Sequence, residues 1–274
     1  MDDRMKNPPS RGAVWFAALT AGSSPQAGFP ASVLVCDATL GTVPARYIAV
    51  VPDPDNRFPR ARHGETGLIE GWQLARAVQQ AIALDHDRAE KRPIVAVVDV
   101  TSQAYGRREE GFGIHQALAA AAGAYAEARL AGHPVIGLIV GKAMSGAFLA
   151  HGYQANRLIA VNDPEVMVHA MGKASAARIT MRSVEALERL ASTIAPMAYD
   201  IASYASLGLL WQSLTLSDPG HPSAKDVATV EASLQAALRD IESDPARNLA
   251  GRLGAANRSA SKRVRDMLRV QWQA

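Results

Sequence analysis

Residues 134–152, PVIGLIVGKAMSGAFLAHG, constrain the fold of this chain more than any other stretch. An apolar run at 135–140 is followed by a turn of small residues and then by the helix-forming run 147–150. This order predicts a buried strand, a tight turn and the first turn of a helix. Backbone N–H groups at a helix start favour an anion, or an oxygen that becomes negative during a reaction. The alternative is that the small residues serve close packing alone.

Composition indicates a globular protein. Apolar residues make up 48% of the 274 positions, which is enough for a sizeable core, and the length fits one domain or one domain with an appendage. No apolar run is long enough to cross a bilayer, and the first residues lack the apolar core of a signal peptide. The single cysteine, Cys36, fits a reducing compartment. We therefore expect a cytoplasmic protein that binds neither membrane nor nucleic acid.

The spacing of apolar residues predicts alternating strands and helices. Strands are expected at 32–36, 45–51, 93–99, 135–140, 157–161 and 166–169, and helices at 67–84, 114–131, within 175–206, at 223–241 and at the end. Residues 12–19 fit either a strand or a helical turn. The pattern is that of an α/β fold with crossover connections. We divide the chain into a lead-in (1–30), a core (31–220) and a C-terminal helical, basic tail (221–274).

Several standard motifs are absent from the sequence. The glycine spacing at 141–146 resembles a phosphate-binding loop, but Ala147 stands where that motif needs lysine. The seven histidines are scattered and form no metal-binding pattern, so we expect no metal site. What remains is two loops, 100–113 and 141–146, each of which follows a strongly apolar strand and opens a helix. If those strands are neighbours, both loops lie at the sheet edge where α/β proteins bind ligands, and their N–H groups can form an oxyanion hole.

The residues of these loops resemble a known family. The run VVDVTSQAYGRREEGFGIHQALAAAAGAYAEARLAGHPVIGLIVGKAMSGAFLAHG is similar to the carboxyltransferase half of acyl-CoA carboxylases, a branch of the crotonase superfamily. The segments GKAMSGAF and VMVHAMG, with the chain length, resemble more specifically the gamma subunit of biotin-independent malonate decarboxylase. The resemblance implies a crotonase-like spiral of ββα units, of carboxyltransferase type, with C-terminal helices.

The resemblance also implies an activity. With a beta subunit, such a chain decarboxylates malonyl-S-acyl carrier protein to acetyl-S-acyl carrier protein and CO2, and backbone oxyanion holes stabilise the thioester enolate. The implied partners are the beta subunit, the acyl carrier protein subunit and an acyl-carrier transferase subunit. No cofactor is bound by the chain itself, because the carrier protein delivers the phosphopantetheine-type arm, which derives from dephospho-CoA.

The same resemblance assigns roles to residues of the two loops. Catalytic roles fall on Gly146, Ala147, Ser102 and Gln103, and substrate-binding roles on Gly106, Met144, Ser145 and His169. The chain departs from the family pattern at two places: Thr101-Ser102-Gln103 replaces Pro-Gly-Phe, and Ser145-Gly146 replaces Gly-Gly. The first departure affects the expected oxyanion donor, because a Cβ at Ser102 limits backbone geometry and ligand approach.

The C-terminal segment is strongly basic. From residue 246 onward seven basic residues face one acidic residue, a net charge of +6, whereas the whole chain carries only +3. Arginine pairs well with carboxylates and phosphates, so Arg258, Arg263 and Arg265 are candidates for docking the acidic carrier protein or its arm. The alternatives are that this helix is simply solvated, or that its apolar face binds a partner subunit.

Two other functions compete with decarboxylation. Ser145 with His169 downstream, and Asp218 after it, suggests a serine hydrolase, and the run SGAFLAHGYQANRLIAVNDPEVMVH resembles Clp-type peptidases. In that family the nucleophile position corresponds to Met144, and a shift of one residue turns a side chain by about 100° on a helix. The second competitor is a non-catalytic partner subunit, which the Thr101-Ser102-Gln103 departure favours.

Overall fold

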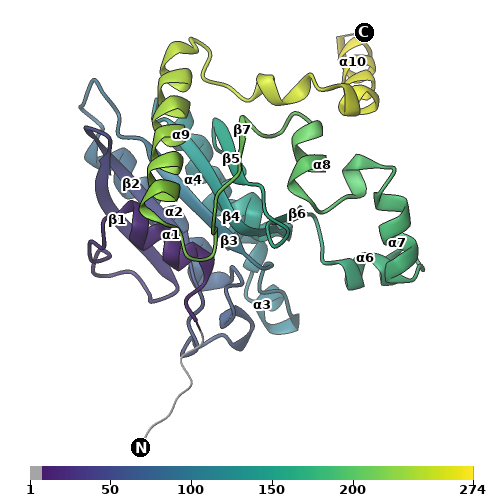
Figure 1. Ribbon diagram of the computed structural model, residues 1–274, viewed down its shortest axis with the longest axis horizontal. Helices are drawn as coiled ribbons and strands as arrows, with labels where there is room; N and C mark the ends of the chain where they lie inside the picture. Colours follow the sequence, from purple (N-terminus) through teal and green to yellow (C-terminus); the bar gives the residue numbers. More distant parts are fainter. Residues whose placement is uncertain (1–7, 274) are drawn as a thin grey trace, which may run out of the picture.

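The computed structural model describes residues 8–273 and consists of a seven-stranded sheet with helices on both faces (Figure 1). The strands are β1 (Val33–Leu40), β2 (Val43–Val50), β3 (Ile94–Val100), β4 (Val135–Met144), β5 (Arg157–Val161), β6 (Met167–His169) and β7 (Gln212–Leu214). Their order is β1-β2-β3-β4-β5-β7, and β6 pairs with β4. Among the strands of residues 8–273, only β1 and β2 pair in antiparallel fashion. All predicted strands are confirmed, and β7 is an addition.

The middle of the sheet is apolar on both faces. In β4 every residue except Lys142 is buried, and β3 is buried apart from the half-buried Asp99. Parallel strands covered by helices on both sides need such continuous apolar runs. The first half of β4 pairs with β5, at 136–139, and its last three residues pair with β6. This division lets β6 lie beside the carboxyl end of β4.

Two long helices cover one face of the sheet. These are α2 (Leu68–Leu84) and α4 (Ile114–Leu130), which pack tightly against each other behind the strands in Figure 1. A Cβ on Gly71 would lie 2.7 Å from the backbone carbonyl carbon of Ala117, so glycine allows the helices to approach this closely. Buried alanines on α4 face this contact and the sheet. The alanine-rich helix therefore serves packing within the chain.

The opposite face is covered by α1 (Arg11–Leu19) and α9 (Ala224–Ser243) (Figure 1). Residues 12–19, which fitted a strand or a helix, form a helix because Ser10 caps it and Trp15 and Phe16 pack inward. Val230 and Leu234 of α9 join the same core. Parts of the lead-in and of the C-terminal range thus contribute to one hydrophobic core. Residues 1–7 of the predicted lead-in lie outside the described residues.

Shorter elements complete the chain. Loop 101–113, expected without regular structure, contains α3 (Arg107–Gly111), and α5 (Ser145–Ala150) follows β4. The helices α6 (Lys173–Ile179), α7 (Val184–Ala191) and α8 (Ile201–Ser206) lie beside the sheet (Figure 1). Four single-turn helices are η1 (Pro59–Ala61), η2 (Ala195–Met197), η3 (Ala250–Leu253) and η4 (Ala256–Arg258). The last helix, α10 (Ser259–Gln273), projects from the body, and none of its residues is buried (Figure 1).

None of the helices between residues 8 and 273 combines the length and the apolar character that crossing a membrane requires.

Candidate functional site

The turn between β4 and α5 has an unusually sharp backbone. β4 ends at Met144, and α5 begins at the next residue without an intervening loop. Ser145 has φ of +57°, in the left-handed region that non-glycine residues seldom occupy. Gly146 and Ala147 lie in the first turn of α5, where backbone N–H groups have no intrahelical acceptor. The predicted strand, turn and helix start are confirmed.

The loop after β3 reaches the same sheet edge. β3 and β4 are parallel neighbours, with Val100 paired to Ala143, so the two loops predicted to lie together do so. The chain before α2 holds this loop in place: the N–H of Thr66 donates to the carbonyl oxygen of Ser102 at 2.9 Å, and the N–H of Ala104 donates to the carbonyl oxygen of Thr66 at 2.9 Å. This small bridge fixes the backbone on both sides of Gln103.

The side chain of Gln103 crosses to the β4–α5 turn. Its Oε1 accepts a hydrogen bond from the N–H of Gly146 at 2.6 Å. An oxygen of the protein itself therefore occupies the N–H that was predicted to stabilise the substrate oxygen. Ser102 makes only a local contact, since its Oγ donates to the carbonyl oxygen of Gln103 at 2.9 Å. Gly106 lies at the start of α3, beside Glu109.

Strand β6 brings His169 to the turn. His169 is paired with Met144 in the parallel register of β4 and β6. Its ring stacks on Tyr199 with a centroid distance of 3.9 Å, and its Nδ1 lies 3.0 Å from the carbonyl oxygen of Met171. The hydroxyl of Tyr199 donates to the same oxygen at 2.8 Å. Burial lowers the pKa of His169, so its imidazole is neutral at neutral pH.

A cavity of about 380 Å³ opens beside the turn. Ser145, Gly146 and His169 line it together, whereas Met144 and Ala147 are buried behind the turn. The remaining wall is mostly apolar and comes from α5, β6, the η2 segment, α8 and the residues next to them: Phe148, Leu149, Tyr153, Val168, Ala170, Ala195, Pro196, Ala198, Tyr204, Leu207 and Leu209. Of the predicted site residues, three therefore meet at this cavity. Ser102, Gln103 and Gly106 are not part of its lining.

The wall residues from η2 and α8 carry no sequence signal of function. Ala195, Pro196 and Leu207 are common loop and packing residues, and they lie about fifty to sixty positions beyond the turn. Only Tyr204 could have been noticed, because a tyrosine in an apolar setting needs a partner for its hydroxyl. Its hydroxyl is buried and has no hydrogen-bond partner within the described residues.

The geometry does not assemble a serine-hydrolase triad. Among residues 8–273 no hydrogen bond joins Ser145 to His169, and Nδ1 of His169 contacts backbone rather than a carboxylate. Asp218 instead accepts hydrogen bonds from the N–H groups of Gly220 and His221, each at 3.0 Å. A base that no carboxylate orients is a poor partner for a serine nucleophile.

Comparison with known proteins decides the family. The family model described as malonate decarboxylase gamma subunit matches residues 61–272. The chain belongs to the malonate decarboxylase gamma subunit family. The resemblance expected from the sequence is thereby confirmed, and the chain is a subunit from a carboxy-lyase and carboxyltransferase family rather than a Clp-type peptidase.

Individual relatives agree with this assignment. A chain of a Pseudomonas malonate decarboxylase hetero-tetramer in complex with coenzyme A is 65% identical, with a TM-score of 0.92, and the match covers 96% of this chain and 100% of that one. A chain of the Pseudomonas MdcD-MdcE hetero-dimer is 62% identical, with a TM-score of 0.89, over 96% of this chain and 99% of that one.

A more distant relative has a different named activity. The malonyl-S-ACP:biotin-protein carboxyltransferase MADD of Malonomonas rubra is 42% identical over 142 residues, which is 51% of this chain. The match spans only 49% of that protein's length.

The carboxyltransferase fold is also confirmed. A chain of transcarboxylase 12S matches 87% of this chain and 43% of its own length with a TM-score of 0.65. Its sequence identity of 19% supports the fold alone. The gamma subunit therefore has the crotonase-like α/β fold of carboxyltransferases, with the C-terminal helices added.

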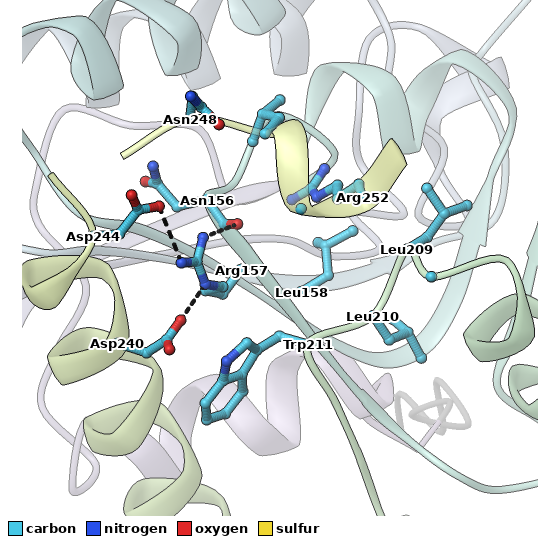
Figure 2. A pocket seen from close by; sticks show the side chains of 13 residues that line it. Asn156, Arg157, Leu158, Leu209, Leu210, Trp211, Asp240, Asp244, Asn248 and Arg252 are labelled. Carbon is cyan, nitrogen blue, oxygen red and sulfur yellow. Dashed lines mark hydrogen bonds and ion pairs between the residues drawn. The ribbon is translucent and has the colours of Figure 1, made fainter. Parts of the chain in front are cut away.

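A second cavity in this gamma subunit, of about 330 Å³, is a structural junction (Figure 2). Arg157 lies between Asp240 and Asp244, and its Nε and Nη2 donate to their carboxylates. Arg252 donates to the backbone carbonyl oxygens of Tyr153, at 2.8 Å, and Ala155, and burial lowers its pKa to about 10. Arg157 thereby attaches the end of α9 to β5, and Arg252 attaches the C-terminal segment to the chain just before β5.

The arginines predicted to dock the carrier line neither of these two cavities. Arg258 ends η4, while Arg263 and Arg265 lie on α10. Arg263 is exposed, and Arg265 is half-buried with its guanidinium 3.5 Å from the carbonyl oxygen of Leu253. Their docking role stays a prediction.

The described residues 8–273 contain no group of three or more His, Cys, Asp or Glu side chains arranged to hold a metal ion.

Proposed function

We propose that this gamma subunit, together with a beta subunit, decarboxylates malonyl-S-acyl carrier protein to acetyl-S-acyl carrier protein and CO2. One observation carries the chemical part of the proposal. The N–H of Gly146 already holds a carbonyl oxygen, that of Gln103, at 2.6 Å, beside a cavity large enough for an acyl group. A backbone N–H that binds an amide oxygen can bind a thioester oxygen in the same place.

The chemistry needs charge stabilisation rather than a nucleophile. When the bond between the methylene carbon and the carboxylate breaks, the electron pair of that bond moves into the thioester group. The thioester oxygen thereby becomes a negatively charged enolate oxygen. The N–H groups of Gly146 and Ala147 stabilise that charge, and a proton then adds to the methylene carbon to give the acetyl group. The side chain of Gln103 must leave Gly146 before the substrate oxygen can bind.

The partners form the second part of the proposal. The matched Pseudomonas proteins are a hetero-dimer and hetero-tetramers, and we infer a complex of this chain with a beta subunit, the acyl carrier protein and an acyl-carrier transferase subunit. The isolated chain leaves α10 uncovered, with Val264, Met267, Leu268 and Trp272 exposed, which suits a subunit contact. The phosphopantetheine-type arm comes with the carrier protein, the chain itself needs no cofactor, and the assembly acts in the cytoplasm.

Reconstitution tests this proposal. The gamma chain, the beta chain and their mixture are each given malonyl-carrier protein, and CO2 release and acetyl-carrier formation are measured. We expect turnover only in the mixture, and we expect sedimentation of the gamma chain alone to show no stable, active monomer. The proposal would be overturned if the isolated chain hydrolysed peptides, or if the mixture with all subunits present released no CO2 and formed no acetyl-carrier protein.

A further inference from the structure

The ring of His169 is contacted by both polar backbone groups of a single residue. His169 ends β6, and Met171 lies two residues further along the chain. Nδ1 of His169 lies 3.2 Å from the backbone nitrogen of Met171 and 3.0 Å from its carbonyl oxygen. The two contacts need opposite states of Nδ1, because the N–H can donate only to a nitrogen without a proton and the oxygen can accept only from a nitrogen with one. Only one of them is therefore a hydrogen bond in a given neutral tautomer of the ring.

The hydroxyl of Tyr199 distinguishes the two tautomers. It donates to the carbonyl oxygen of Met171 at 2.8 Å, and burial raises the pKa of Tyr199, so the hydroxyl keeps the proton that it donates. With this oxygen already paired, every polar group has a partner when the N–H of Met171 donates to Nδ1. A proton on Nδ1 would instead bring a second donor to the oxygen and leave the N–H of Met171 without an acceptor among residues 8–273. The neutral ring of His169 therefore carries its proton on Nε2.

Tyr199 is itself held in place. Its ring stacks on the ring of His169 with a centroid distance of 3.9 Å and an angle of 14° between the two planes. Nζ of Lys173 lies 5.6 Å from the centre of the Tyr199 ring and pairs with Glu188 at 2.7 Å. These contacts come from α6, α7 and the segment before α8, which lie beside β6 in Figure 1. Tyr199 thus fixes the plane of the histidine ring as well as the position of its proton.

The other nitrogen of the His169 ring has no protein partner. Nε2 makes no hydrogen bond within residues 8–273, and it does not belong to the fully buried polar atoms of the described chain that lack a partner, so it remains accessible. His169 lines the cavity together with Ser145 and Gly146, and β6 pairs it with Met144, the residue before the turn. Nε2–H is therefore available to a group that binds at the turn. It cannot act as a base for Ser145, because a nitrogen that carries a proton does not accept another.

We propose that Tyr199 is a positioning residue, which binds the carbonyl oxygen of Met171 and so keeps the proton of His169 on Nε2, and that this Nε2–H donates to the thioester oxygen of the substrate bound at Gly146. The proposal rests on the proposed decarboxylase function and adds a side-chain donor to the backbone donors of the turn. Only the Nε2–H group touches the substrate, whereas Tyr199 acts through His169.

A neutral donor suits an oxygen whose charge grows during the reaction. The thioester oxygen of the bound substrate is a weak acceptor, and the enolate oxygen that forms as CO2 leaves is negatively charged. A hydrogen bond to a charged oxygen is stronger than one to a neutral oxygen, so Nε2–H stabilises the transition state more than the bound substrate. The proton stays on Nε2 throughout, and no charge on the ring is needed.

The tautomer of His169 can be measured directly. The gamma chain is labelled with an NMR-active nitrogen isotope in its histidines, assembled with the beta chain and studied by proton–nitrogen NMR correlation, with His169→Gln to assign the signal. We expect Nε2–H in the wild type. Tyr199→Phe removes the hydroxyl and keeps the ring, so the ratio of tautomers should move roughly fivefold toward Nδ1–H, the effect of one hydrogen bond. Tyr47→Phe removes a comparable bond, to the carbonyl oxygen of Thr39 at 3.2 Å, and should leave the ratio unchanged.

Kinetics of the reconstituted complex separate a positioning role from a structural one. His169→Ala should lower kcat by roughly 10²-fold, the loss typical of a missing oxyanion donor. Tyr199→Phe should lower kcat by up to roughly fivefold with little change in KM, because it reduces the population of the donating tautomer. In the His169→Gln background the same change should have no effect, since the glutamine amide donates in its only form. A structural role of the hydroxyl would lower kcat equally in both backgrounds.

The outcomes separate this inference from the proposed function. If the wild-type complex releases no CO2, the proposed function fails together with the donor role of His169, and the NMR measurement still decides whether Tyr199 sets the tautomer. If the wild type turns over but its ring carries the proton on Nδ1, or if Tyr199→Phe leaves the tautomer ratio unchanged, only this inference is overturned. An equal loss of kcat from Tyr199→Phe in the two backgrounds overturns it as well.

Discussion

The side-chain oxygen of Gln103 accepts a hydrogen bond from the backbone N–H of Gly146, 43 positions further along the chain, at 2.6 Å. A Cβ on Gly146 would lie 2.6 Å from the same oxygen, so only glycine leaves room for this contact. The bond joins the β3 loop to the β4–α5 turn, the two segments predicted to form an oxyanion hole. The proposed substrate oxygen therefore competes with the side-chain oxygen of Gln103 for the N–H of Gly146.

This competition predicts the effect of Gln103→Ala. Removing the amide frees the N–H of Gly146, and a typical hydrogen bond of about 1 kcal/mol corresponds to a roughly fivefold lower KM for malonyl-carrier protein. Steady-state kinetics of the reconstituted complex measures this. A raised KM, or a large loss of kcat with KM unchanged, would show that Gln103 supports the turn instead of blocking it.

Gly146→Val should abolish most activity. The valine side chain would displace Gln103 and obstruct the approach of the substrate oxygen, and losing an oxyanion donor costs roughly 10²-fold or more in kcat. Gly123→Val is a matched control, because Gly123 lies on α4 with open space around its missing Cβ. Normal decarboxylation by a folded Gly146→Val variant would refute the oxyanion assignment.

Ser145 is expected to have no covalent role, so Ser145→Ala should keep most of the activity. Its φ of +57° is strained for any residue with a Cβ, and Ser145→Gly should therefore unfold at the same or a higher temperature than Ser145→Ala. Turnover and thermal unfolding of the two variant complexes check both points. Complete loss of activity in Ser145→Ala, or labelling of Ser145 by a fluorophosphonate, would instead support a hydrolase.

His151 should make the protein sensitive to acid. It is fully buried between the hydroxyl of Tyr125 and the carbonyl oxygen of Val97, each 3.0 Å away, and burial lowers its pKa from 6.5 to about 4. The imidazole of His151 binds a proton more readily in the unfolded chain than in the folded one. The free energy of unfolding that this residue contributes is therefore fully present above about pH 6.5 and is lost as the pH falls toward 4. The loss in the free energy of unfolding is on the order of 3 kcal/mol.

His151→Gln should therefore flatten the pH dependence of the unfolding temperature between these pH values, measured on the complex at fixed concentration. The buried His133 and the half-buried His169 also have lowered pKa values and should account for the slope that remains. An unchanged slope in the variant would show that His151 does not control acid sensitivity.

The basic C-terminal helix α10 is predicted to attract the acidic carrier protein and so to increase the rate at which the two proteins associate. Reversing Arg263 and Arg265 to Glu should raise KM for the carrier substrate and flatten its salt dependence, with little change in kcat. Reversal of Lys225 and Arg239, two exposed residues on α9, changes the net charge equally and should have a smaller effect. If both pairs behave alike, the docking surface lies elsewhere.

Much of this protein could be predicted from its sequence because the signals are local. Continuous apolar runs predicted β3 and β4, helical spacing predicted α2 and α4, and the small residues around Gly146 predicted the turn. The family resemblance rested on the same contiguous stretch. Residues 12–19 remained ambiguous because eight residues with apolar side chains on several faces fit either a strand or a helix.

Only the tertiary structure decided which distant groups meet. The contact between Gln103 and Gly146 depends on the bridge to Thr66 and on the parallel pairing of β3 with β4. The cavity depends on the pairing of β6 with the end of β4, which brings His169 to the turn, and on the chain from η2 to α8, which places Tyr204 in the wall. Such contacts are set by chain topology and packing over long sequence separations, and a pattern of neighbouring residues does not encode them.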